Sequence, residues 1–512
     1  MGADAHLRKS ASPQTGTTTL LALVRAQAAR TPDRPAVLGA TSLTYRRLLR
    51  QADGIGGWLR GRGVRQGDAV GVARGRGGDL PGLILGIHAC GAVYVPIDPL
   101  SPEPLRERIV ATVQPRLVID ESEVLPDGTS EASPEGLDGA GGDLAVLRQG
   151  DDPTAYVIFT SGSTGDPKGV RLSHEGLYDY ARALPARVGT TAEDRCLGLA
   201  PPGFSSSIRQ LLVPLAVGAA VVVCDEDDVR TPWAFLDLLA RHAVTQLDVV
   251  PSFWRALTDT QDDAELARTL VTVRRTLFAS ERLDAALVRR TIEVAPHSRV
   301  WNMYGCSETT GIIAACDVTA LTDTPGPLPI GTGLDHVRLG VRRLDAGEEL
   351  VVTGRAVAIG YLGRRNGGIE PVGAGARRLT TGDLVSRDED GRFVWRGRAD
   401  RQSKVRGFRV NHEAVEAELG RCPAIRRAAV VAADTDGLEV AYTERAGEGI
   451  EPSRLIRWAR EELPPPMVPA AAHRVSSWPE LPNGKTDLMR LRRLVPVRSS
   501  PAKRELEERD GD

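Results

Sequence analysis

About a third of the way along the chain the sequence reads Tyr156-Val-Ile-Phe-Thr-Ser-Gly-Ser-Thr-Gly-Asp-Pro-Lys-Gly-Val170. An apolar run of strand length leads directly into a loop of glycines and small hydroxyl residues, whose backbone N–H groups and hydroxyls can surround phosphate oxygens. The hydroxyls belong to Thr160, Ser161, Ser163 and Thr164. The loop is not a Walker loop, which needs Gly-Lys-Ser/Thr, because Pro167 precedes Lys168. The segment predicts a phosphate-binding loop; its length and the preceding strand disfavour the alternative of a flexible Ser/Gly turn.

The surroundings of this loop are typical of an α/β protein. Over most of the first 400 residues, apolar runs of strand length alternate with amphipathic helical patterns. The expected strands are 70–73, 92–97, 116–119, 155–159, 220–224, 246–250 and 276–279, and the expected helices include 80–90, 177–186 and 283–294. Such alternation predicts buried sheets covered by helices.

The character of the sequence changes after about residue 330, where short strands such as 349–353 and 392–395 alternate with glycines. A densely charged stretch, 397–409, follows and suits a domain junction. Beyond it, Asn411 can cap a helix with apolar residues on one face. The expected architecture is a large N-terminal domain of packed β-sheets with helices over 1–399, a small mobile α+β domain over 400–495, and a charged tail over 496–512.

Composition excludes several classes of protein. The 512 residues are 41% hydrophobic and 26% charged, as in globular proteins of more than one domain. A formal net charge of −2 predicts no nucleic-acid partner. The apolar run 211–224 contains a proline and a glycine and is too short to cross a bilayer, and the N-terminus lacks the apolar segment of a signal peptide. We therefore expect a cytoplasmic protein with no membrane partner.

Cysteine and lysine usage adds two further indications. The six cysteines are scattered without C-x-x-C spacing, which argues against a disulfide framework and a zinc site. Only five of the 65 basic residues are lysines. Three of these, Lys168, Lys404 and Lys485, lie inside organised segments, where a compact ammonium on a flexible stem differs in use from a planar guanidinium.

Further motifs follow in a fixed order along the chain, and together with the phosphate loop they resemble the ANL adenylate-forming superfamily. The segments that carry the resemblance are Leu85 to Asp98, Asn302 to Thr310, Gly347 to Leu362, Thr381 to Asp383, Gly397 to Asp400 with Gln402 to Arg409, and Pro482 to Lys485. The first of them, Leu85-Gly-Ile-His-Ala-Cys-Gly-Ala-Val-Tyr-Val-Pro-Ile-Asp98, is similar to nonribosomal peptide synthetase adenylation domains rather than to acyl-CoA ligases.

The resemblance implies ATP and Mg²⁺ as cofactors and assigns residues to them. The implied nucleotide-binding set is Thr160, Ser161, Gly162, Ser163, Thr164, Gly165, Lys168, Asn302, Tyr304, Ser307, Asp383, Trp395 and Arg398. In this set Tyr304 would stack on adenine, and Asn302 would bond the exocyclic amine. Asp383 would accept hydrogen bonds from the ribose hydroxyls, with Trp395 beside it unless that residue is a simple core aromatic. Glu308 would supply a hard oxygen to Mg²⁺, and Ser307 a hydroxyl to the α-phosphate.

The resemblance also implies the catalytic residues Lys485, Glu308, Lys404 and Asp400. Lys485 would reach the forming acyl phosphate and offset charge at the α-phosphorus. Asp400 occupies a hinge position, and rotation there would replace Lys485 by the Lys404 loop so that a thiol can attack the adenylate. The implied activity is ATP-dependent, AMP-forming ligation of a carboxylic acid.

The substrate pocket departs from the pattern of amino-acid-activating relatives. Ser205 stands where these relatives have the aspartate that binds the α-amine, which places an ordinary α-amino acid in doubt. The pocket positions are Phe204, Ser205, Ser206, Arg209, Asp248, Leu277, Ala279, Met303, Gly311 and Ile312. Arg209 could clamp a second acidic group and Asp248 an amine away from the α position, or the two could pair with each other. We expect a small polar carboxylic acid, such as a non-α or modified amino acid.

Several alternatives concern the acceptor. Only 27 residues follow Lys485 and none forms a Gly-Gly-x-Ser phosphopantetheine site, so a separate carrier protein is the expected partner. Coenzyme A or a small amine would use the same adenylate. A binding protein without turnover is the second class of function, although the presence of Lys168, Glu308, Asp383 and Lys485 argues against it.

Overall fold

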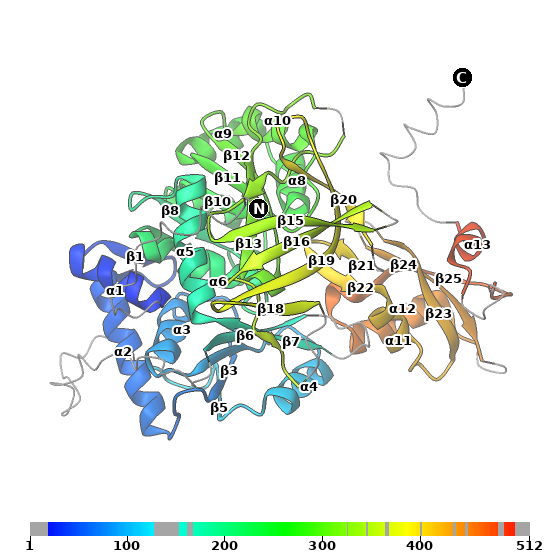
Figure 1. Cartoon of the computed structure of the whole chain (residues 1–512), viewed down its shortest axis with the longest axis horizontal. Helices are drawn as coiled ribbons and strands as arrows, with labels where there is room; N and C mark the ends of the chain where they lie inside the picture. Colours follow the sequence, from blue (N-terminus) through cyan, green and yellow to red (C-terminus); the bar gives the residue numbers. More distant parts are fainter. Residues whose placement is uncertain are drawn as a thin grey trace, which may run out of the picture.

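The structure is a computed structural model of the chain (Figure 1). It describes residues 19–126, 153–160, 167–324, 326–344, 347–363, 368–399, 402–433, 437–445, 449–479 and 486–496. Within these ranges, none of the helices has both the length and the apolar character that a bilayer crossing requires.

A nine-stranded sheet forms the centre of the large N-terminal domain (Figure 1). Its strands, in spatial order, are β14 (Thr332–Gly333), β13 (Gly311–Asp317), β12 (Arg299–Cys306), β11 (Arg275–Phe278), β10 (Gln246–Val249), β8 (Arg195–Gly198), β9 (Ala220–Val223), β1 (Pro35–Leu38) and β2 (Leu43–Thr44). The strands from β12 to β1 run parallel and are largely buried, and the Ala-Val-Val-Val run of β9 is apolar throughout.

A six-stranded sheet packs beside it and carries the phosphate-loop motif. Its order is β17 (Gly360–Tyr361), β7 (Lys168–Ser173), β6 (Thr154–Thr160), β4 (Val93–Pro96), β3 (Ala69–Ala73) and β5 (Leu117–Asp120). Strands β6 and β7 are antiparallel, with Thr160 opposite Lys168. The pairing places the two ends of the motif side by side.

Helices cover both faces of the nine-stranded sheet. On one face lie α1 (Leu20–Arg30), α2 (Tyr45–Gly61), α3 (Leu80–Ala89), α5 (His174–Val188) and α6 (Ser205–Leu212), which share a core with the six-stranded sheet. On the other face lie α7 (Pro232–Arg241), α8 (Pro251–Thr260), α9 (Asp263–Thr269) and α10 (Ala285–Val294). Helix α4 (Glu103–Val113) and the 3₁₀ turns η1 (Pro214–Val217), η2 (Leu270–Thr272) and η3 (Ser307–Thr309) complete this part.

A third sheet, mostly antiparallel hairpins, follows in the chain. It contains β15 (Val337–Leu344), β16 (Gly347–Gly354), β19 (Ala376–Arg387), β18 (Ile369–Gly373) and β20 (Phe393–Arg398). Alternating burial along β19 places every second residue in the core, which brings Thr381 and Asp383 to the same inner face.

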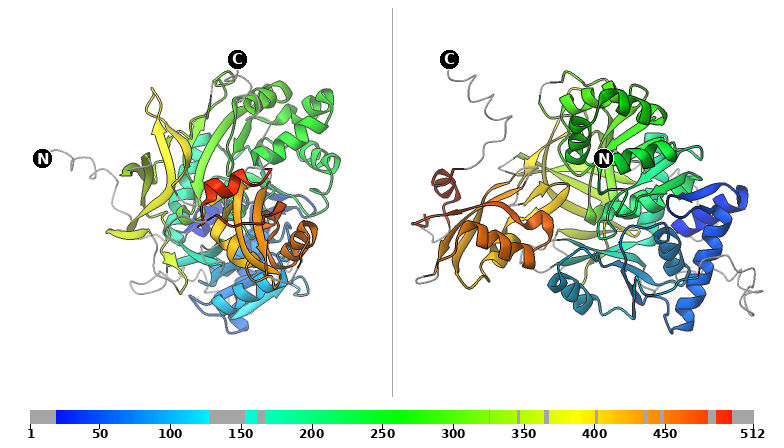
Figure 2. Two further views of the ribbon diagram at one scale, coloured as in Figure 1. Left: turned by 90° about the vertical axis from the view of Figure 1, so that its right-hand side faces the viewer. Right: turned by 180° about the vertical axis from the view of Figure 1, so that it is seen from behind.

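The C-terminal domain, here the described residues from Gln402 onward, lies against one side of the large domain (Figure 2). It consists of the hairpin β21 (Gln402–Val405) and β22 (Phe408–Asn411), the sheet β23 (Ile425–Ala433), β24 (Leu438–Glu444) and β25 (Pro469–Arg474), and helices α11 (His412–Leu419), α12 (Pro452–Glu462) and α13 (Leu488–Arg493), with the turn η4 (Pro465–Met467). It has a hydrophobic core of its own.

The fold confirms the predicted class, and all the strands and helices proposed from the sequence are present within a few residues of their expected bounds. Asn411 caps α11 through its side chain, which accepts a hydrogen bond from the Ala414 amide, while Val415 and Leu419 are buried. The helix is therefore fixed to the hairpin that precedes it.

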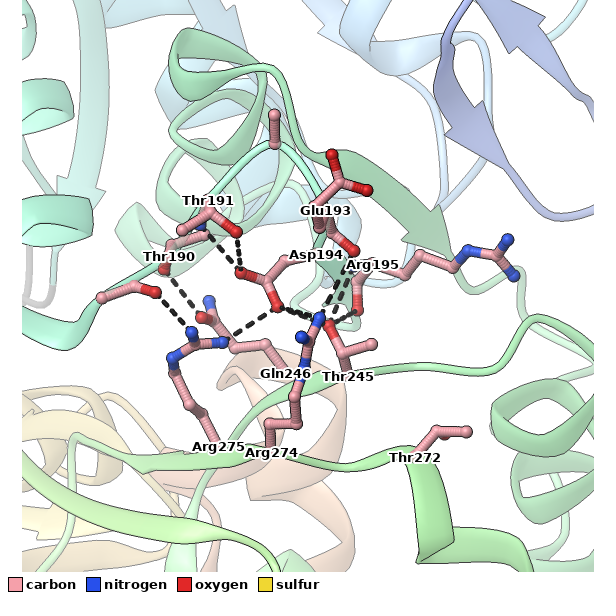
Figure 3. Close-up of polar contacts among 12 residues, drawn as sticks. Thr190, Thr191, Glu193, Asp194, Arg195, Thr245, Gln246, Thr272, Arg274 and Arg275 are labelled. Carbon is pink, nitrogen blue, oxygen red and sulfur yellow. Dashed lines mark hydrogen bonds and ion pairs between the residues drawn. The ribbon is translucent and has the colours of Figure 1, made fainter.

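One buried polar network stabilises the amino-terminal ends of the parallel strands (Figure 3). The Asp194 carboxylate, which is fully buried, accepts hydrogen bonds from Arg274 (3.0 Å), Arg275 (2.9 Å) and the Thr245 hydroxyl (2.8 Å) through Oδ1. Its Oδ2 accepts from the Thr191 amide at 2.8 Å. Burial alone would raise the pKa of Asp194, but these donors lower it below its ordinary value. The network lies at the strand ends opposite to those where ligands bind in such sheets.

Candidate active site

The predicted ribose and adenine residues converge on one carboxylate. The Tyr304 hydroxyl, from β12, donates to Asp383 Oδ2 at 2.5 Å. The Trp395 indole N–H donates to Asp383 Oδ1 at 2.8 Å, and Arg398 Nη1 lies 3.1 Å from the same oxygen. Three strands, β12, β19 and β20, thus fix the carboxylate from three sides.

Burial controls the ionisation of this group of residues. The pKa of Tyr304 is raised well above its ordinary value, first by burial and then by the neighbouring Asp383 charge. Tyr304 therefore stays protonated and remains a donor to Asp383 at neutral pH. Arg398 and Asp383 are 8% and 5% exposed in their side chains, so their ion pair is shielded from solvent.

The nucleotide cavity beside these residues has a volume of about 1260 Å³. Asn302, Tyr304, Asp383, Trp395 and Arg398 line it, as their predicted roles require. The Asn302 side-chain amide donates to the Pro329 carbonyl at 2.9 Å, which fixes the carboxamide and leaves its oxygen as an acceptor for an exocyclic amine.

Two residues predicted to bind the metal ion and the phosphates, Glu308 and Lys168, lie near the same tyrosine, Tyr361. Glu308, in η3, is 5% exposed, and its Oε1 accepts a hydrogen bond from the Tyr361 hydroxyl at 3.1 Å. The Lys168 ammonium lies 5.8 Å from the centre of the same tyrosine ring. A hard carboxylate and a lysine therefore occur together beside the end of the phosphate-loop strand β6.

A second cavity, the acyl cavity, has a volume of about 230 Å³. Six of the ten predicted pocket residues line it: Phe204, Ser205, Ser206, Arg209, Gly311 and Ile312. The Ser205 and Ser307 hydroxyls are 3.4 Å apart, so the position that replaces the usual aspartate lies next to the predicted α-phosphate contact. Thr160 and Ser307 also border this cavity.

The remaining pocket residues, Asp248, Leu277, Ala279 and Met303, are buried and do not line the acyl cavity; Met303 lines the nucleotide cavity instead. Arg209 and Asp248 form an ion pair, with Nη2 and Oδ1 3.0 Å apart and side chains 6% and 9% exposed. Of the alternatives that the sequence left open, the structure therefore has the two residues paired with each other. Asp248 lies on the far side of Arg209 from the acyl cavity.

The acyl and nucleotide cavities meet. Both are lined by Ser280, Gly305, Cys306 and Lys404. Gly305 is needed at this junction because a Cβ there would lie 2.0 Å from the Gly311 carbonyl oxygen. Ligands in the two cavities would consequently be in contact at this point.

The C-terminal domain supplies part of both walls. The Lys404 ammonium, on β21, lies 5.6 Å from the centre of the Tyr304 ring. Phe408, on β22, packs edge-on against Phe204 with ring centres 4.2 Å apart. Gly407 has φ +83°, and a Cβ there would approach Val250 to 3.0 Å. The hairpin therefore fits closely into the large domain in this orientation.

Some predicted residues lie outside the described residues. These are the loop residues Ser161, Gly162, Ser163, Thr164 and Gly165, the hinge residue Asp400 and the catalytic Lys485. Their roles stay predictions from the sequence.

The sequence analysis missed several residues that the structure brings to the site. Phe408 and Cys306 line the acyl cavity, and Tyr361 bonds Glu308. Glu281 accepts hydrogen bonds from the Ser252 amide and hydroxyl, both at 2.7 Å, beneath the nucleotide cavity. Cys306 and Tyr361 fall inside quoted motifs, so their positions were a usable signal; Glu281 lies outside those motifs.

Comparison with known proteins bears directly on this arrangement. The profile of a family described as AMP-binding enzyme matches residues 24–362, and that of the AMP-binding enzyme C-terminal domain matches residues 414–485. The chain belongs to the AMP-binding enzymes of the ANL superfamily. It is thus a ligase of an ATP-using, adenylate-forming family, as the motifs predicted.

The relatives of this AMP-binding enzyme are synthetases. It is 34% identical over 501 residues to a probable non-canonical nonribosomal peptide synthetase, CymA, of Salinispora arenicola, covering 93% of this chain and 6% of that protein. The structure of holo-PA1221, a nonribosomal peptide synthetase protein containing adenylation and PCP domains, matches with a TM-score of 0.77 at 25% identity, covering 95% and 85% of the two chains. The amide bond synthetase McbA from Marinactinospora thermotolerans shares the fold, with a TM-score of 0.78 at 23% identity and coverage of 93% and 99%.

Proposed function

We propose that this AMP-binding enzyme activates a small polar carboxylic acid, such as a non-α or modified amino acid, and passes the acyl group to the thiol of a carrier protein. The observation that carries the proposal is the junction of the two cavities at Gly305 and Cys306. An acid in one cavity and ATP in the other would place a carboxylate next to the α-phosphate, beside Ser307.

In the first half-reaction a carboxylate oxygen attacks the α-phosphorus, and the bond to the pyrophosphate leaving group breaks. Charge grows on the phosphoryl oxygens, so donors and cations fixed beforehand lower the barrier. We assign this role to the Ser307 hydroxyl, which borders the acyl cavity, to Lys168, and to Lys485 as the mobile cation. Asp383 would orient the ribose through its remaining acceptor capacity.

Glu308 fits a role in holding Mg²⁺. Its buried carboxylate provides a hard oxygen, and its Oε1 accepts a hydrogen bond from the Tyr361 hydroxyl. Mg²⁺ is commonly held by one or two carboxylates together with substrate phosphates, and when bound it neutralises phosphate charge.

In the second half-reaction the thiol sulfur attacks the acyl carbon, the thiol proton is lost, and AMP leaves. We assign the hinge to Asp400, at the junction between domains proposed as 1–399 and 400–495. Lys404 beside Tyr304 and Phe408 against Phe204 support an orientation in which the hairpin has closed on the site after activation.

The choice of acid follows from Ser205. Where related enzymes place an aspartate for an α-ammonium, this chain offers a hydroxyl 3.4 Å from the Ser307 hydroxyl. Asp248 is already paired with Arg209. An α-ammonium group would therefore enter the cavity without a counter-charge, at a cost of desolvation.

The decisive experiment is ATP–pyrophosphate exchange over a panel of amino, hydroxy, aryl and dicarboxylic acids. We expect exchange with a small class of polar acids, abolished in Lys485→Ala and unchanged in the matched control Lys503→Ala. Silence across the panel with intact ATP binding would instead support a binding protein without turnover. Efficient exchange with an ordinary α-amino acid alone would contradict the proposed substrate.

The acceptor is tested separately with the preferred acid. A carrier protein bearing phosphopantetheine, coenzyme A and a set of small amines are supplied in parallel, and acyl transfer is followed by mass spectrometry. We expect the carrier to be acylated fastest. Faster transfer to coenzyme A or to an amine would assign the enzyme to those acceptors while leaving adenylation intact.

A further inference from the structure

The Arg209–Asp248 pair contributes Arg209 to the wall of the acyl cavity, while Asp248 does not line that cavity. Arg209 extends from α6 and lines the cavity together with Gly311 and Ile312 of β13. Asp248 lies on β10 between Leu247 and Val249, which point to the opposite core, so its side chain points toward α6. Both members of the pair therefore belong to regular secondary structure of the large domain, and neither lies on a loop.

A neighbouring residue holds the pair in place. The Gln210 side chain donates to the Asp248 carbonyl at 2.9 Å and accepts from the Leu199 and Ala200 amides at 2.8 and 2.7 Å. These bonds join α6 to β8 and β10 on both sides of Arg209. The guanidinium is thus positioned before any acid binds.

The two charges of the pair cancel each other. Arg209 Nη2 lies 3.0 Å from Asp248 Oδ1, and both side chains are more than nine-tenths buried. A second carboxylate on the substrate would find a guanidinium whose charge is already compensated and would approach Asp248 as a like charge. For such an anion, the free-energy cost of desolvation would exceed its electrostatic attraction to the pair.

One donor of the pair is unused. Within the part of the chain that the structure describes, Arg209 Nη1 is buried and has no hydrogen-bond partner. A buried donor without an acceptor is destabilising, so the guanidinium favours a ligand atom that can accept a hydrogen bond. The Ser205 and Ser206 hydroxyls on the same helix and apolar Ile312 also line the cavity, whose other charged residues are Asp98, Arg108, Lys404 and Glu418.

We propose that the acid carries an uncharged hydrogen-bond acceptor, a hydroxyl or carbonyl oxygen, at its end distal to the reacting carboxylate, and that this atom accepts from Arg209. The inference rests on the proposed function and narrows its substrate. It makes Arg209 a specificity-determining residue and Asp248 the residue that excludes a second anionic group.

The test compares three acids of one skeleton, chosen as the fastest in the exchange panel. They differ only in the distal group, which is methyl, neutral acceptor or carboxylate, as in pentanoate, 4-oxopentanoate and glutarate for an aliphatic skeleton. We expect kcat/KM for exchange to favour the neutral acceptor at least tenfold over both others. A preference of the wild type for the methyl or the carboxylate member would overturn the proposal.

Two variants assign the preference to the pair. Arg209→Met combined with Asp248→Leu removes both charges together, which leaves no uncompensated buried charge. We expect this variant to lose the preference for the acceptor, measured as the ratio of kcat/KM for the acceptor acid to kcat/KM for the methyl acid. Asp248→Asn leaves the Arg209 charge uncompensated, and we expect it to raise the rate with the dicarboxylate at least tenfold relative to the methyl acid.

The outcomes separate this inference from the proposed function. If the double variant keeps the wild-type preference, or Asp248→Asn does not shift toward the dicarboxylate, the inference is wrong while adenylation stands. If no acid supports exchange in any of these proteins although ATP binds, the proposed function itself fails. Circular dichroism and melting temperature verify that each variant is folded.

Discussion

The Tyr304 hydroxyl donates to Asp383 Oδ2, the oxygen that Trp395 and Arg398 leave free. All three donors come from strands of the large domain. The carboxylate that we propose to bind ribose is therefore fixed whatever the position of the C-terminal domain, and its geometry can be tested by substitution.

Asp383→Asn should weaken nucleotide binding and destabilise the fold together. The substitution leaves the buried Arg398 without its ion partner, and breaking a buried pair costs about 3–5 kcal/mol. We expect AMP affinity to fall at least tenfold by calorimetry, with a lower melting temperature. Asp390→Asn, at a carboxylate 68% exposed, is the control and should change neither quantity. Unaltered AMP affinity in a folded Asp383→Asn protein would remove Asp383 from the binding site.

Lys404→Ala should separate the two half-reactions. Because Lys404 reaches Tyr304 from the C-terminal domain in the closed arrangement, its loss affects acyl transfer. We expect transfer to slow at least tenfold and pyrophosphate exchange to change less than threefold. Arg457→Ala removes an exposed cation of the same domain and should leave both rates unchanged. Equal losses in the two half-reactions would show that Lys404 acts in adenylation as well.

Cys306 should report occupancy of the site. It is partly exposed at the junction of the cavities, whereas Cys90, Cys196, Cys224, Cys316 and Cys422 are buried. We expect a maleimide to modify one thiol in the native protein, as shown by intact mass. ATP with the preferred acid should slow the reaction, and Cys306→Ser should abolish it. Labelling at undiminished rate in the presence of both ligands would place the acyl-adenylate elsewhere.

Stability should fall in mild acid because of two buried histidines, His88 and His174, whose rings are 4.9 Å apart. Burial, and then the neighbouring His174, lowers the pKa of His88 to about 3; burial lowers that of His174 to about 4. In the unfolded chain both titrate near pH 6.5. Below that pH the unfolded state binds more protons, so the free energy of unfolding falls until the folded pKa values are reached.

From pH 7 to 5.5 the two histidines should together remove about 2 kcal/mol of stability. Urea unfolding at several pH values measures this loss. His174→Phe should reduce the slope, and His297→Gln, at an exposed histidine, should leave it unchanged. A slope in His174→Phe equal to that of the wild type would exclude this origin.

Much of the fold could be predicted because its determinants are local. Runs such as Ala220 to Cys224 can bury both faces only as central strands, and Asn411 has the side chain that a helix N-terminus requires. The site residues were identified through motifs that resemble those of the ANL superfamily, so the resemblance, and not local physical chemistry, assigned their roles.

What the sequence could not supply were contacts between distant elements. Arg209 and Asp248 are separated along the chain by the turn η1, strand β9 and helix α7, so only the packing of α6 on β10 decides whether they meet. The contact of Phe408 with Phe204 depends on how two domains dock. In both contacts, the residue type alone does not predict which distant residue it will meet.

The hairpin that carries Lys404 and Phe408 has a thermodynamic consequence. Because both domains line the acyl cavity, whatever fills it binds the docked arrangement more tightly than the separated one. Because this coupling is reciprocal, a partner that shifts the equilibrium toward the docked arrangement also raises the affinity for the acyl group. The two effects are equal in size. The acyl ligand therefore couples the stability of two domains whose hydrophobic cores are separate. Differential scanning calorimetry should show that the two domains unfold more cooperatively as the ligand is added.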